Sequence, residues 1–168
     1  MTPPGRGSGS VSPTRARDLV VAAVIAALLG NLVAAVVYGS LPDLPLLAGA
    51  TFAVLGAAEA VAGWGLRRRI RRVPGAGPVD PLATARAVLV AQASARAGAV
   101  MAGIWAGLLA YTLPRAGLLT AAGGDAAAAG VGLGSSLVLV AGALWLEYCC
   151  RAPDDPDPSG TDGPPAAR

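Results

Sequence analysis

Four long apolar stretches dominate the chain, and polar or proline-rich segments separate them. They cover residues 19–39, 46–66, 90–113 and 126–148. Each has about 20 residues or more, the length that an α-helix needs to cross the ~30 Å hydrocarbon core of a bilayer. The pattern predicts an all-α integral membrane protein, a four-helix bundle within residues 18–150.

The residues between these stretches predict where the helices begin and end. Asp80 suits the N-cap of the third helix and Pro81 its first position. A helix from Pro81 to Leu113 would be about 50 Å long, which is more than crossing requires. We therefore expect the second and third helices to extend into the cytoplasm. Asp125 is expected to cap the fourth helix.

Both ends of the chain lack apolar periodicity. Residues 1–17 are rich in Pro, Gly, Ser and Arg, and residues 151–168 form an acidic segment rich in Pro and Asp. Such composition predicts disordered tails. A cleaved signal peptide is the alternative for the first apolar stretch, but its apolar region would be shorter, roughly 7–15 residues, so we favour an uncleaved span.

Composition and charge agree with a membrane protein and predict its orientation. Hydrophobic residues make up 54% and charged residues 14% of the chain, against about 25% charge in soluble domains. The connection between the second and third helices carries a cluster of five arginines: Arg67, Arg68, Arg69, Arg71 and Arg72. The positive-inside rule then places both termini in the cytoplasm of a multi-pass protein of the cell (inner or plasma) membrane.

The same arginine cluster is open to a second interpretation. It could attract anionic lipid head groups, at about 1 kcal/mol for each arginine near the surface, although setting the topology explains it alone. A pI of about 9.4 would suggest nucleic acid for a soluble protein. Here the arginines flank apolar spans, so no nucleic-acid partner is expected.

The residue types narrow the chemistry. The chain has no His and only two cysteines, Cys149 and Cys150, whose Cα atoms are about 3.8 Å apart, too close for ordinary disulfide geometry. We expect passive interfacial thiols, with lipidation or thiol chemistry as the alternative. No catalytic constellation is recognisable, so we expect no enzyme, no metal site and no cofactor.

Two charges lie inside apolar stretches, where each costs about 3 kcal/mol or more. Glu59 is 18 residues before Gly77, the centre of the middle connection, and Arg96 is 19 residues after it. In an antiparallel hairpin such positions lie at one level, so Glu59 and Arg96 could form an ion pair with Gln92 beside it. A structural pair is favoured over a transport or proton-relay site, and unpaired snorkelling of Arg96 is the third interpretation. Asn31 is expected to form a hydrogen bond between helices.

Two GxxxG patterns, Gly103 to Gly107 and Gly130 to Gly134, favour close helix packing. The sequence leaves open whether these contacts lie within one chain or between protomers.

Several short segments, in order, resemble one known family. They are Pro13-Thr14-Arg15, Ala58-Glu59-Ala60, Asp80-Pro81-Leu82-Ala83 through Arg86, Ala93-Ser94-Ala95, Leu113-Pro114-Arg115 and the segment from Trp145 to Cys150. In these segments the chain resembles an uncharacterised actinobacterial membrane protein family, domain of unknown function 3180. The resemblance implies a four-span protein without an assigned activity. It also implies a Lys at the position of Gln92, so that the partner of Glu59 has moved one turn to Arg96.

Together these patterns predict a small structural or accessory protein of a larger membrane complex. The alternative is a small oligomeric transporter or channel that uses the layer of Glu59, Arg96 and Gln92. The expected partners are the lipid bilayer, anionic head groups, and either a larger complex or further copies of the chain.

Overall fold

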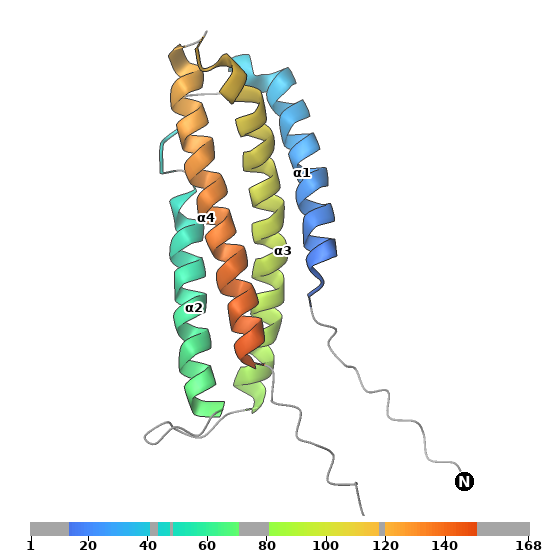
Figure 1. The fold of residues 1–168 in the computed structure, drawn as a ribbon, viewed down its shortest axis with the longest axis vertical. Helices are drawn as coiled ribbons and strands as arrows, with labels where there is room; N and C mark the ends of the chain where they lie inside the picture. The colour runs from blue at the N-terminus through green and yellow to red at the C-terminus, as the bar shows by residue number, and fades with distance from the viewer. Residues whose placement is uncertain (1–13, 41–43, 48, 71–80, 118–119, 151–168) are drawn as a thin grey trace, which may run out of the picture.

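The computed structural model describes residues 14–40, 44–47, 49–70, 81–117 and 120–150, which are mostly helical and include no strand (Figure 1). The four long helices are α1 (Ala16–Val37), α2 (Ala50–Ile70), α3 (Pro81–Thr112) and α4 (Thr120–Cys150). Short 3₁₀ turns, η1 (Tyr38–Ser40) and η2 (Leu113–Arg115), follow α1 and α3.

The helix ends differ in places from the predicted ones. α1 begins at Ala16, inside the segment predicted to be a disordered tail. α4 begins at Thr120, so Asp125 lies within the helix and not at its N-cap. The alanines that follow Thr120 have the highest helix propensity of all residues, which explains the earlier start. The remaining tail residues, 1–13 and 151–168, lie outside the described residues.

In space the helices follow the order α1, α3, α4, α2, with α3 and α4 as the central pair (Figure 1). α1 packs along α3, and α2 packs along α4, whereas α2 and α3 make only marginal contact. Because consecutive helices run in opposite directions, each outer helix is parallel to the helix on which it packs. We call the end where α1 and α3 begin the basal end, and the opposite end the distal end.

Glycines let both outer helices lie close to the central pair. Gly103 and Gly107 of α3 lie against the backbone of α1, where an added Cβ would collide with carbonyl oxygens. Gly56 of α2 lies against the backbone of α4, and Gly142 of α4 lies against Gly56 in return. Without a hydrophobic force between helices in lipid, such close backbone packing is a main source of association.

The two GxxxG patterns are used differently. The pair Gly103 and Gly107 forms a contact within the chain, between α3 and α1. Around Gly130 and Gly134, by contrast, an added Cβ would meet no described atom within 4 Å. The second pattern therefore takes no part in the packing of the described helices.

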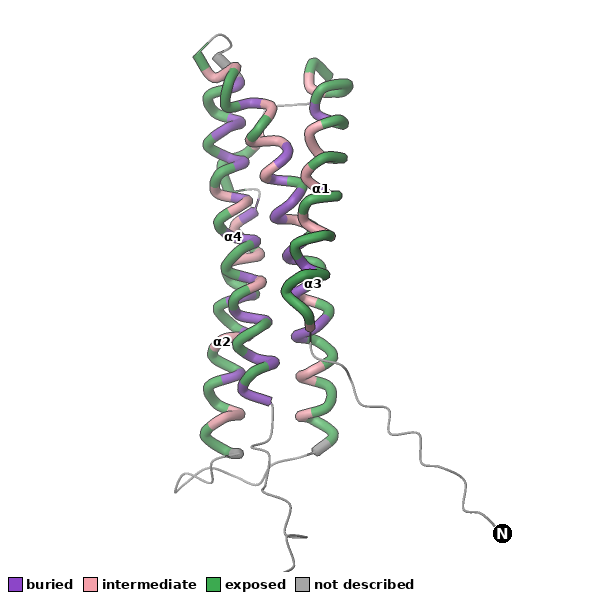
Figure 2. Tube along the Cα trace, turned by 45° about the vertical axis from the view of Figure 1, so that its right-hand side comes forward, coloured by how far each residue is buried: buried purple, intermediate pink, exposed green. Residues whose placement is uncertain are grey.

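The core between α3 and α4 consists mainly of alanines. Six alanines of α3 and α4 are completely buried: Ala91, Ala95, Ala122, Ala128, Ala129 and Ala143. Figure 2 shows buried segments, in purple, along both α3 and α4. Trp105 is the one large ring in this interface, and it packs against Gly132, which provides the space for it.

The outer surface of the helices is strongly apolar. Three segments are long and apolar enough to cross a membrane: Ala16–Ser40, Leu82–Arg115 and Ala122–Cys150. α2 is not among them, since Glu59 and its terminal arginines lower its mean hydropathy. Even so, Val54 of α2 is 71% exposed and Val36 of α1 is 77% exposed. Apolar faces of this extent are typical of a surface that meets lipid or another protein.

Candidate functional site

Glu59 lies on the buried side of α2. It shares this side with Gly56 and Gly63, which both lie against α4. The residue is only 5% exposed, and neither carboxylate oxygen has a hydrogen-bond partner among the described residues. Burying a carboxyl group without a hydrogen-bond partner costs free energy of folding. Glu59 is therefore a candidate for a functional role in the α2–α4 contact.

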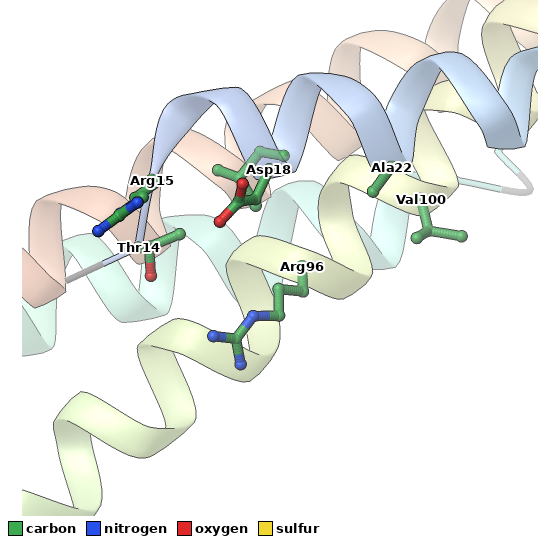
Figure 3. Close-up of a pocket in the computed structure, with 7 residues that line it drawn as sticks. Thr14, Arg15, Asp18, Ala22, Arg96 and Val100 are labelled. Atoms are coloured by element: carbon green, nitrogen blue, oxygen red, sulfur yellow. The ribbon is translucent and has the colours of Figure 1, made fainter. Parts of the chain in front are cut away.

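Gln92 and Arg96 lie one turn apart on α3, but they differ in burial. Gln92 is buried at 6% exposure, whereas Arg96 is exposed. The side chain of Arg96 lines a cavity at the basal end, between α3 and the beginning of α1, together with Thr14, Arg15 and Asp18 (Figure 3). Arg96 therefore lies level with the first turn of α1, just before the apolar stretch that starts at Leu19.

The structure does not bring Glu59 and Arg96 together. Glu59 is buried against α4, and Arg96 faces α1 on the other side of the central pair. The predicted ion pair requires the consecutive helices α2 and α3 to pack side by side. Among the described residues, α4 instead lies between α2 and α3 and packs along both. The polar layer expected from Glu59, Arg96 and Gln92 is thus not assembled among the described residues.

A polar contact at the basal end involves a residue that the sequence patterns did not single out. The backbone N–H of Thr14 donates a hydrogen bond to Oε1 of Glu147, at 3.0 Å. Glu147 is on α4 and is only 4% exposed. The contact joins the start of α1 to α4, although these two helices do not pack along each other. The signal in the sequence was a lone carboxylate in the apolar run that ends α4.

A second polar cluster lies at the distal end, around Asp125 of α4. Its Oδ2 accepts a hydrogen bond from the Tyr38 hydroxyl at 2.6 Å, and its Oδ1 accepts one from the Leu44 N–H at 3.1 Å. Tyr38 also stacks on Tyr111, with ring centroids 5.2 Å apart. The guanidinium of Arg115 lies 3.9 Å from the centroid of the Tyr111 ring. Asp125 thus connects Tyr38, which follows α1, and Leu44 to α4 by hydrogen bonds.

Asn31 connects α1 to α3 in the middle of the apolar region. Its side-chain amide donates a hydrogen bond to the carbonyl oxygen of Gly107, at 3.2 Å. Gly107 lies against the backbone of α1 at this point, so the short side chain of Asn31 can reach across.

The arginine cluster is partly used within the bundle. Arg67 lies over the rings of Trp145 and Tyr148 on α4, at 5.6 and 5.4 Å from their centroids. Arg68 lies 5.6 Å from the ring centroid of Trp64 on its own helix. Such cation–π contacts contribute about 0.5–1 kcal/mol at exposed sites. Of the five arginines, Arg71 and Arg72 lie outside the described residues.

The cysteines lie at the basal end of α4. Cys149 and Cys150 are both buried and free. Cys150 packs in an apolar cluster with Ala91 of α3 and Leu146 of α4. Within the described part of the chain, no group of three or more His, Cys, Asp or Glu residues could hold a metal ion.

Comparisons with known proteins place the chain in a family. No curated protein and no solved structure matches it. A family model described as "Protein of unknown function (DUF3180)" matches residues 19–154. This range contains all of α2, α3 and α4 and nearly all of α1. The match covers most of the sequence, and the chain therefore belongs to this family of proteins of unknown function.

Proposed function

We propose that the chain is a four-span integral membrane protein with both termini in the cytoplasm, and that it is an accessory subunit of a larger membrane complex. For the fourth span, the support is the length of α2. Its 21 residues extend about 31 Å at 1.5 Å per residue, which matches the hydrocarbon core. For the orientation, the support is the arginine cluster at the basal end of α2.

One observation carries the accessory role. Among the described residues, the polar contacts of Glu147 and Asp125 lie at the two ends of the bundle. Between these ends, Glu59 and Asn31 lie on α2 and α1, which do not pack along each other. A transporter needs polar groups that continue from one side of the membrane to the other. α1 and α2, by contrast, each pack on one helix and leave broad apolar faces. Faces of this kind are suited to partner helices.

A crosslinking experiment in native membranes tests this role. A photoreactive residue replaces Val61 of α2 or Leu28 of α1, which are 67% and 68% exposed. The matched control is Ala143, which is completely buried between helices. We expect an adduct with one larger membrane protein from at least one exposed position and none from Ala143. Adducts between copies of this chain alone would contradict the accessory role and favour the oligomeric transporter.

A further inference from the structure

A cavity of about 320 Å³ lies between the start of α1 and the middle of α3 (Figure 3). Its polar side is lined by Thr14, Arg15, Asp18 and Arg96. Figure 3 shows the guanidinium groups of Arg15 and Arg96 both extending toward the basal end, with the Thr14 hydroxyl between them in this view.

The groups on the polar side are suited to an anion. Among the described residues, Arg96 forms no hydrogen bond or ion pair, and the buried Thr14 hydroxyl oxygen has no hydrogen-bond partner. The lining also contains one carboxylate, Asp18, which forms an exposed ion pair with Arg17 at 3.6 Å from its Nε. Two guanidinium groups and a hydroxyl are the donors that proteins commonly use to hold phosphate oxygens.

The opposite side of the cavity is apolar. It is formed by Leu19 and Ala22 of α1 and by Val100 of α3. Two of them follow the polar lining by about one turn toward the distal end: Ala22 lies four residues after Asp18, and Val100 four residues after Arg96. The cavity thus changes from charged to apolar at the level where the apolar stretch of α1 begins.

We propose that this cavity binds one membrane phospholipid, with its phosphate held by Arg96, Arg15 and Thr14. Its acyl chain lies along Leu19, Ala22 and Val100, in the direction of the helices. A phosphate ion alone would use only the polar half of the cavity, whereas a phospholipid uses both halves. The inference rests on the membrane placement in the proposed function, but it needs no partner complex.

Native mass spectrometry of the purified, delipidated full chain tests the site. The probe is short-chain phosphatidylglycerol, added in a mild detergent. The two variants are Arg96→Gln and the matched control Arg68→Gln, which removes an arginine that lies over Trp64 and outside the cavity. We expect the wild type and Arg68→Gln to bind one lipid with equal affinity. We expect Arg96→Gln to bind about tenfold more weakly or worse, because it loses charge-assisted hydrogen bonds.

Two further measurements distinguish a phospholipid ligand from a free anion. Inorganic phosphate in excess should fail to displace the lipid, and Ala22→Phe, which fills the apolar side, should weaken lipid binding about as much as Arg96→Gln. Displacement by inorganic phosphate would show a site for a soluble anion and overturn the lipid assignment. Equal lipid affinity of wild type and Arg96→Gln, or an equal loss in Arg68→Gln, would overturn the site itself. Because these measurements use the isolated chain, they are independent of whether a partner complex is found.

Discussion

The two outer helices, α1 and α2, are attached to the central pair in different ways. Both are parallel to the helix on which they pack, and both use glycine contacts. α1 is in addition tied by hydrogen bonds near its start, in its middle and at its end: Thr14 with Glu147, Asn31 with Gly107, and Tyr38 with Asp125. α2 instead buries Glu59 without a described partner, and Arg67 lies over aromatic rings of α4.

This difference shows what holds an apolar helix in place. α1 is the most apolar of the helices, yet only 11% of its most apolar window is buried. Lipid tails are as apolar as its side chains, so burial alone gives it no fixed position. Hydrogen bonds and close backbone contact are therefore needed to fix α1. α2 has fewer hydrogen bonds, and its position depends more on backbone contact.

The largest effects are expected from the glycine contacts, which both helices share. Gly103→Leu should push α1 away from α3, and Gly56→Leu should push α2 away from α4, because the added atoms meet backbone. Overpacking of this kind costs about 1–3 kcal/mol or more. Thermal melting in mild detergent should show a loss of several degrees for both. Gly134→Leu is the matched control, since nothing described lies near it, and a loss as large there would contradict the packing.

A smaller effect is expected at the distal tie of α1. Asp125→Ala removes the acceptor for both Tyr38 and Leu44, which should cost about 1–3 kcal/mol because the donors are left unpaired. Tyr38→Phe removes one of the two bonds and should cost less. In the double variant Tyr38→Phe should add almost nothing to Asp125→Ala. Full additivity of the two losses in thermal melting would contradict a direct contact.

The smallest effect is expected for the coupling between Glu59 and Arg96. The two side chains lie on different sides of the central pair, and separated sites usually add within about 0.3–0.5 kcal/mol. The melting temperatures of Glu59→Gln, Arg96→Gln and the double variant should therefore give a coupling energy near zero. A coupling energy of about 1 kcal/mol or more would instead support the predicted ion pair between Glu59 and Arg96. It would also require α2 and α3 to be neighbours and would contradict the helix order described above.

The helices themselves follow from the sequence. Apolar length predicts all four long helices, and Pro81 begins α3 because proline has no N–H to lose in a first turn. Gly103 and Gly107 of α3 likewise indicate a close helix contact, because the backbone of another helix can approach this closely only where the Cβ atom is missing. The start of α4 was misjudged, because Asp125 suits an N-cap but is buried inside the helix as an acceptor for other segments.

The neighbours of each helix were decided only by the tertiary structure. Helices rich in Ala, Val, Leu and Gly are apolar on nearly all sides, so the pattern along the chain does not tell which side meets protein and which meets lipid. The site depends on this choice: once α4 lies between α2 and α3, Glu59 is buried against α4 and Arg96 joins Thr14 beside α1. Sequence thus determined the four helices, and backbone contact with a few buried polar groups determined their order.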